Sequence, residues 1–142
     1  MKRVLILCTG NSARSLMAEY LINTRLAGQW HAESAGVNPS KPNPWALKVL
    51  SEIGIDASDA RSKSVDEFLE RKNLDLVVTV CDHARETCPV FTKPIKQIHI
   101  GFEDPAEFTD APEEIALMKF REVRDLIAKQ LLSLLREMNS QS

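Results

Sequence analysis

The sequence predicts one α/β domain, residues 1–142, with a four-stranded parallel sheet flanked by helices on both faces. Expected strands alternate with expected helices along the chain, and this order is typical of a parallel sheet. The expected strands at 4–7 and 74–80 are nearly continuous apolar runs, as strands covered on both faces usually are. The chain contains no internal repeat, no low-complexity tract and no linker long enough to divide it.

The first half of the chain begins with a strand and a helix. Residues 4–7 are branched and apolar, which indicates a buried strand, and residues 13–26 carry the apolar spacing of a helix. A second strand is expected at 30–35, and Gly36 ends it. These segments predict a first strand–helix–strand unit.

A loop and a second helix follow. Residues 37–44 include three prolines and predict a surface loop. Asn43 can cap a helix with its side chain, and Pro44 suits the first helical position. This helix is expected to reach about Glu52, and Gly54 is its natural stop.

The second half continues the alternation. A polar, irregular segment at 56–64 leads to a short expected helix at 65–71 and a buried strand at 74–80. A further strand is expected at 96–101, followed by a polar loop at 102–110. The last helix then places apolar residues three or four apart on one face: Ala116, Phe120, Val123, Ile127, Leu131 and Leu134.

Composition restricts the classes of function. The net charge is −2, so no global basic field favours binding to nucleic acid or to a membrane. Only five apolar residues follow Met1-Lys2-Arg3, too few for a signal peptide or a membrane span, and a cytoplasmic, monomeric protein is expected. Three cysteines argue against a structural disulfide framework and favour reactive thiols.

A thiol and an arginine bracket the loop between the first strand and the first helix. Loop N–H groups and a helix dipole converge at such a position and attract an anion. A helix N-terminus and a guanidinium both favour the thiolate form of Cys8, while Arg14 can grip two oxygens. The alternative is a small core residue and a surface charge. The expected oxyanion-binding residues are Cys8, Thr9, Gly10, Asn11, Ser12, Ala13 and Arg14.

Cys81 and Cys88 are seven residues apart. If 82–87 is helical, they lie about 10 Å apart along the axis, whereas a disulfide needs α-carbons within about 7 Å. Joining them would require this segment to unwind. The alternatives are two unrelated cysteines, or a zinc site with His83 and His99, which lacks the paired short spacings of such sites. No metal and no cofactor are expected.

Reactive groups follow three expected strands. Cys8, Cys81 and the segment 101–104 all come just past strand ends, which in a parallel sheet meet at one edge. Asp104 in this position can donate a proton to a leaving oxygen, although an ordinary Asp-Pro turn is the alternative. Glu19 lies one turn along from Ser15, either as a solvated carboxylate or as support for the loop.

These residues carry a family resemblance. The segment from Cys8 to Ser15, with Asp104-Pro105 late in the chain, resembles the low-molecular-weight protein tyrosine phosphatase superfamily. With the run 78–81 and Cys88, the chain resembles the thioredoxin-coupled arsenate reductases within it. The resemblance extends from residue 3 to about residue 135 and implies reduction of arsenate in arsenic detoxification.

The resemblance implies roles for the residues of the loop. Cys8 would attack arsenate, which the loop amides and Arg14 would hold. Ser15 would stabilise the Cys8 thiolate, and Asp104 would protonate the departing oxygen. Phosphate and sulfate are expected competitors, and a weak phosphatase side activity is expected because the loop chemistry is shared.

The resemblance also implies a thiol relay. Cys81 would attack Cys8, release arsenite and leave a disulfide. Cys88 would then attack Cys81, and the resulting disulfide, on a looped-out segment, would be presented to thioredoxin. Arsenate reduction takes two electrons, and one dithiol-to-disulfide step supplies two.

The chain departs from its relatives behind the loop. Some relatives bind potassium through Asn, Glu, Ser and Asp; Asn11, Glu19 and Ser34 match the first three, but Lys63 stands in the fourth place. A lysine ammonium can satisfy Glu19 in place of the cation, so no potassium dependence is expected. Ala13 replaces a cysteine that many relatives carry.

Two other functions remain open at this level. In a tyrosine phosphatase, Cys8, Arg14 and Asp104 would work alone, while Cys81 and Cys88 protected against oxidation. The tyrosine phosphatases usually place an aromatic residue after Asp-Pro, whereas this chain has alanine at position 106. A non-catalytic oxyanion or redox sensor would bind its anion or form a disulfide without turnover.

Overall fold

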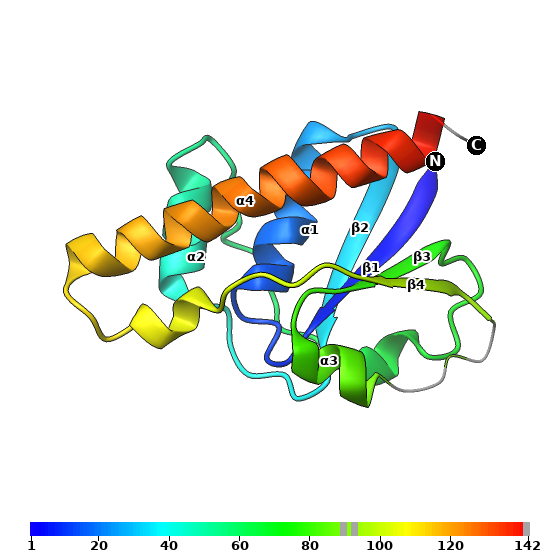
Figure 1. Ribbon diagram of the computed structural model, residues 1–142, viewed down its shortest axis with the longest axis horizontal. Helices are drawn as coiled ribbons and strands as arrows, with labels where there is room; N and C mark the ends of the chain where they lie inside the picture. Colours follow the sequence, from blue (N-terminus) through cyan, green and yellow to red (C-terminus); the bar gives the residue numbers. More distant parts are fainter. Residues whose placement is uncertain (89–90, 92–93, 141–142) are drawn as a thin grey trace.

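The computed structural model describes residues 1–88, 91 and 94–140 and contains one sheet of four parallel strands in the order β2–β1–β3–β4 (Figure 1). This confirms the predicted sheet. The strands are β1 (Lys2–Cys8), β2 (Trp30–Gly36), β3 (Leu76–Thr79) and β4 (Lys96–His99).

Helices cover both faces of this sheet. The helical segments are α1 (Arg14–Arg25), α2 (Pro44–Ser51), α3 (Asp82–Thr87), α4 (Glu113–Ser140) and the 3₁₀ turns η1 (Val65–Phe68) and η2 (Pro105–Phe108). Helices α1, α2 and α4 pack on one another, with α4 lying across α1 (Figure 1). Ser34 of β2 faces α1, while Glu33, its neighbour, faces the other side and pairs with Arg71 beyond η1.

The core lies around the central strand β1. Val4, Leu5, Ile6 and Leu7 are each 0% exposed. Because successive side chains of a strand point to opposite faces, four consecutive buried residues mean that both faces are covered. The carboxyl end of β1 is thereby fixed, and Cys8 is its last residue.

Several expected segments are shorter in the structure than in the sequence analysis. The helix expected at 65–71 is only the 3₁₀ turn Val65–Phe68, which the Ser64 side chain caps. The strand expected at 74–80 narrows to Leu76–Thr79, although the N–H of Asp75 and the N–H of Val80 still donate to β1 carbonyls. The loop expected at 102–110 contains η2.

The last helix confirms most of its expected core face and corrects one position. Ala116, Phe120, Val123, Ile127 and Leu131 are buried as expected. Leu134 is only partly buried, and Leu135 takes its place in the core. In the part of the chain that is described, no helix has the length and apolar character needed to cross a membrane.

Candidate active site

The loop between β1 and α1 is held in place by hydrogen bonds that neighbouring segments donate to its carbonyl groups. Every carbonyl oxygen from Cys8 to Ser12 accepts a hydrogen bond. Backbone N–H groups of the segment 37–43 supply four of these bonds, at 2.8 to 3.1 Å, and the Ser62 hydroxyl supplies the fifth, at 2.7 Å. With the carbonyls engaged outside, the N–H groups are the backbone groups that this loop can offer to an anion.

Gly36, the last residue of β2, allows this close approach. A Cβ at position 36 would lie 2.5 Å from the carbonyl oxygen of Thr9 and 2.9 Å from the backbone nitrogen of Asn11. Both neighbours are backbone atoms, so they cannot move aside as a side chain would. A glycine is therefore required here for the loop to rest on the end of β2.

The loop encloses a pocket of about 310 Å³. Asp104, from the segment after β4, also lines this pocket, and its role as a proton donor stays a prediction. Asn11 is the one expected oxyanion-binding residue that does not line the pocket, because its backbone has a positive φ of 51° and its side chain is turned into the interior. The lining residues are Cys8, Thr9, Gly10, Ser12, Ala13, Arg14 and Asp104.

The buried side chain of Asn11 organises the loop from behind. The backbone N–H of Lys63 donates to Oδ1 of Asn11 at 2.8 Å, which fixes the orientation of the amide. The amide Nδ2 then donates to Oγ of Ser15 at 2.7 Å and to Oγ of Ser34 at 2.9 Å. All hydrogen-bonding groups of this buried side chain are thus satisfied.

This network determines which way the Ser15 hydroxyl points. Ser15 Oγ accepts from Asn11, so its own proton is available for the Cys8 sulfur, 2.8 Å away. The backbone N–H of Asn11 donates to the same sulfur at 3.2 Å. Two donors are thus placed beside one sulfur. That Ser15 supports the Cys8 thiolate stays a prediction.

Glu19 is the far end of the same network. Ser34 donates its hydroxyl proton to Oε1 of Glu19, and the Lys63 ammonium lies 3.4 Å from that oxygen. The side chains of Lys63 and Glu19 are only 13% and 15% exposed. The Glu19 carboxylate is thus largely shielded and hydrogen-bonded, and its role as support for the loop stays a prediction. That Lys63 replaces a cation stays a prediction.

Arg14 spans the mouth of the pocket. Its Nη1 donates to the carbonyl oxygen of Phe102 at 3.0 Å, and its Nη2 lies 3.5 Å from Oδ2 of Asp104. The other oxygen of Asp104 accepts from the N–H of Ala106 at 2.9 Å and caps η2. Arg14 and Asp104 therefore meet across the pocket.

Cys81 lies beside the loop, at the N-cap of α3. Its sulfur is 3.3 Å from the Thr9 hydroxyl and accepts from the N–H of Ala84 at 3.4 Å. Cys88 lies at the other end of α3, and burial raises the pKa of its thiol. No disulfide joins the three cysteines, all of which are among the described residues. The helix considered at 82–87, which would have to unwind for Cys81 to reach Cys88, is present as α3.

A model of the low molecular weight phosphotyrosine protein phosphatase family matches residues 3–142. The chain belongs to this family. The arsenate reductase of Halalkalibacterium halodurans is 43% identical over 130 residues, 92% of each chain. That of Bacillus subtilis is 41% identical over 130 residues, again 92% of each chain. A solved thioredoxin-dependent arsenate reductase of Corynebacterium glutamicum matches with a TM-score of 0.68 and 26% identity over 97% of this chain and 63% of that one.

The comparisons confirm the resemblance stated from the sequence. Family membership and the similarity to arsenate reductases both extend over most of the chain. The fold with its four parallel strands is that of the family. The roles of individual residues stay predictions.

The described residues of this chain contain no cluster of metal-ligating side chains. No group of three or more His, Cys, Asp or Glu side chains there is placed to hold a metal ion. His99, one of the residues of the zinc alternative, instead contacts Thr79 and Asp82.

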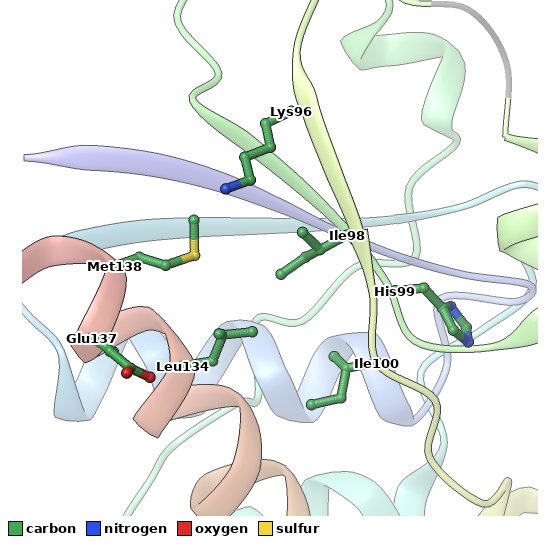
Figure 2. A pocket seen from close by; sticks show the side chains of 7 residues that line it. All are labelled: Lys96, Ile98, His99, Ile100, Leu134, Glu137 and Met138. Atoms are coloured by element: carbon green, nitrogen blue, oxygen red, sulfur yellow. The ribbon is translucent and has the colours of Figure 1, made fainter. Parts of the chain in front are cut away.

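A second pocket, of about 470 Å³, lies away from the loop between β4 and the end of α4 (Figure 2). Ile98 and Ile100 point from β4 towards α4, while His99 lies on the other side of the strand (Figure 2). The residues that line this second pocket are Lys96, Ile98, His99, Ile100, Leu134, Glu137 and Met138.

Sequence reasoning missed three features of the site. These are the hydrogen bonds from the segment 37–43 to the loop carbonyls, the close approach of the loop backbone to Gly36, and the contact of Thr9 with Cys81. The prolines and polar residues of 37–43 and the glycine at the end of β2 were visible as loop or stop signals only. None of them identifies its spatial partner without the fold.

Proposed function

We propose that this chain reduces arsenate to arsenite by a three-cysteine relay, with thioredoxin as the reductant. The observation that carries the proposal is the contact between Thr9, which lines the pocket, and the sulfur of Cys81, 3.3 Å from its hydroxyl. It brings a second thiol to the rim of the loop that holds Cys8. The arsenate reductases of Halalkalibacterium halodurans and Bacillus subtilis support the substrate, and the thioredoxin-dependent one of Corynebacterium glutamicum supports the reductant.

The first step forms a bond between sulfur and arsenic. The Cys8 thiolate, held by the donors of Ser15 and Asn11, attacks the arsenic of arsenate. Arg14 and the loop N–H groups bind the remaining oxygens and spread their charge. One oxygen leaves as water after it receives a proton from Asp104. Phosphate and sulfate compete for the same pocket because they have the same four-oxygen shape.

Asp104 is placed to act as this proton donor. Its Oδ2 lies 3.5 Å from Nη2 of Arg14, and its Oδ1 accepts from the N–H of Ala106. An oxyanion bound by Arg14 in this pocket would therefore lie beside the carboxyl group of Asp104.

The second and third steps move the oxidation outward. The Cys81 thiolate attacks the Cys8 sulfur; an S–S bond forms, the S–As bond breaks, and its electron pair reduces arsenic to the trivalent state, which leaves as arsenite. The Cys88 thiolate then attacks the Cys81 sulfur and releases the Cys8 thiolate. A thioredoxin dithiol reduces the Cys81–Cys88 disulfide and becomes a disulfide itself, so electrons balance.

The test is arsenite production with arsenate, thioredoxin, thioredoxin reductase and NADPH. We expect continuous turnover in the unaltered chain and none in the Cys8→Ser variant. The Cys88→Ser variant is expected to stop after one arsenite per chain, because the Cys8–Cys81 disulfide is not passed on. Continued turnover of Cys88→Ser would contradict the relay, and activity with glutaredoxin but not thioredoxin would contradict the reductant.

A phosphatase is the second candidate, because the pocket, Arg14 and Asp104 are complete without Cys81 or Cys88. Hydrolysis of p-nitrophenyl phosphate discriminates between the two. Under the relay we expect slow hydrolysis that survives in Cys88→Ser while arsenate turnover stops. Efficient hydrolysis of phosphotyrosine, with no arsenite formed in any reductant system, would favour the phosphatase.

A further inference from the structure

We infer that His99 is a positioning residue of the relay: through Asp82 it holds α3 against the sheet and opposes the unwinding that joins Cys81 to Cys88. Nε2 of His99 lies 3.2 Å from Oδ1 of Asp82, the first residue of α3. The inference rests on the proposed relay, in which α3 must open. Nothing in the reaction steps uses His99 or Asp82 directly.

Among the residues that the structure describes, the polar contacts that hold α3 lie mostly at its start. Of its six residues, only Ala84 is buried. Its start is tied through the Cys81 sulfur, which contacts the Thr9 hydroxyl and caps the N–H of Ala84. Both ties use the atom that reacts, so they are weakened as soon as Cys81 bonds to another sulfur. The contact of Asp82 with His99 does not involve a reacting atom and persists.

His99 is well placed to act as the fixed partner. It pairs in register with Thr79 at the end of β4, and its side chain is 20% exposed. Its Nδ1 lies 2.9 Å from the Thr79 hydroxyl. This hydrogen bond fixes the ring and leaves Nε2 facing Asp82. Arg85, which lies 3.7 Å from the same carboxylate, belongs to α3 itself and does not tie it to the sheet.

The direction of the ring agrees with this role. Side chains alternate along a strand, so His99 points away from its neighbours Ile98 and Ile100. Figure 2 shows the two isoleucines on the α4 side of β4 and His99 on the other side. Ile98 and Ile100 thus face α4, while the ring of His99 reaches α3 through Asp82.

The test measures the thiol–disulfide equilibrium of Cys81 and Cys88 alone, in a Cys8→Ser background without arsenate or thioredoxin. The chain is equilibrated in glutathione buffers and its thiols are alkylated and counted by mass. Cys81 and Cys88 form one S–S bond and give up two electrons and two protons, which convert one glutathione disulfide into two glutathione thiols. A constant for oxidation follows for each variant.

His99→Phe keeps a ring of similar size and removes both nitrogens. We expect its oxidation constant to rise about two- to fivefold, the range that an exposed ion pair supplies, and the midpoint potential to fall by about 9 to 21 mV. His31→Phe, the same substitution on β2 at the opposite edge of the sheet, is the matched control and is expected to leave the constant unchanged.

Asp82→Ala shows whether His99 acts through Asp82. The Asp82 side chain is 77% exposed, so this variant folds even if His99→Phe does not. Adding His99→Phe to Asp82→Ala is expected to produce no further rise, and amide exchange in α3 is expected to speed up in both single variants. Equal effects of His99→Phe with and without Asp82, or no change beyond that of His31→Phe, would overturn the inference. Absence of a Cys81–Cys88 disulfide in every buffer would instead overturn the relay, and the role of His99 with it.

Discussion

The hydroxyl of Ser15 lies 2.8 Å from the sulfur of Cys8 and is oriented towards it by the buried amide of Asn11. Removing this hydroxyl withdraws one of two donors from the sulfur and leaves one of the two N–H groups of the Asn11 amide without its acceptor, while the other still donates to Ser34. A hydrogen bond to a charged group contributes about 1.5 to 3 kcal/mol. We therefore expect the Ser15 hydroxyl to be a main support of the Cys8 thiolate.

We expect Ser15→Ala to slow alkylation of Cys8 at neutral pH about tenfold or more, in line with the loss of one such bond. The measurement uses iodoacetamide in a Cys81→Ser, Cys88→Ser background, so that position 8 is the only thiol. Ser51→Ala, a solvent-exposed change at the end of α2, serves as the control. Alkylation of Ser15→Ala at the control rate would show that the hydroxyl does not support the thiolate.

The pair of Lys63 and Glu19 predicts a stability effect and an ion effect. Lys63→Gln leaves the poorly exposed Glu19 carboxylate without its ammonium, and we expect a loss of about 2 to 4 kcal/mol in the free energy of unfolding. Lys48→Gln is the matched control, because Lys48 pairs with Glu113 at the surface and contributes about 0.5 kcal/mol. Urea denaturation measures both.

The same pair leads us to expect no preference for potassium. The unaltered chain should show the same melting temperature and the same turnover in potassium as in sodium, because the ammonium already occupies the neighbourhood of Glu19. Lys63→Asp is expected to lose stability in sodium and to regain part of it in potassium. A marked stabilisation of the unaltered chain by potassium would refute the assignment of Lys63.

Much of the fold could be predicted because it follows from local patterns. The apolar runs around Leu5 and Val78 and the cap at Asn43 are each encoded in a few neighbouring residues, and the structure confirms them. The ends of elements were less certain. Leu134 and Leu135 are adjacent leucines near the end of a long helix. Leu135 is the buried one because of the way α4 packs in the fold, which the spacing of leucines alone does not predict.

The candidate site also has a part that local sequence predicts and a part that it does not. The loop from Cys8 to Arg14 carries its chemistry in consecutive residues, so a sequence pattern is enough to find it. The support behind the loop joins residues that are far apart in the chain: Lys63 donates to Asn11 across 52 positions, and Thr9 reaches Cys81 across 72. No local periodicity predicts such contacts, and they became visible only with the register of β1 against β2 and β3.

The close packing of the loop on Gly36 predicts that no side chain is tolerated at position 36. Gly36→Ala would force Cβ to within 2.5 Å of the Thr9 carbonyl oxygen, so the loop must lift from β2. We expect weaker phosphate binding by at least tenfold and a loss of stability of about 1 to 3 kcal/mol. Gly10→Ala is the comparison: its Cβ meets the Ser40 hydroxyl at 3.1 Å, a side-chain atom that can rotate away, so a smaller loss is expected. Equal effects of the two changes, measured by calorimetry, would argue against the close approach at Gly36.

Tyr20 provides a prediction on alkaline pH. Burial, and then the hydrogen bond that its hydroxyl donates to Asp59 at 2.7 Å, raise the pKa of Tyr20 above its ordinary value. The ordinary value is about 10, so the unfolded chain loses the phenol proton first. The stability from this group is therefore complete below about pH 10 and is lost as the pH rises towards the folded-state pKa.

We expect Tyr20→Phe to lower the free energy of unfolding by about 0.5 to 1.5 kcal/mol at neutral pH and to narrow that gap progressively above about pH 10. Because the chain contains a single tyrosine, tyrosinate absorbance reports on this group directly. Asp59→Asn keeps an acceptor but removes the charge, so it should return the titration part of the way towards its ordinary value. A tyrosinate that forms at the ordinary pKa, or a stability gap that does not change with pH, would contradict the effect of burial and of Asp59 on this phenol.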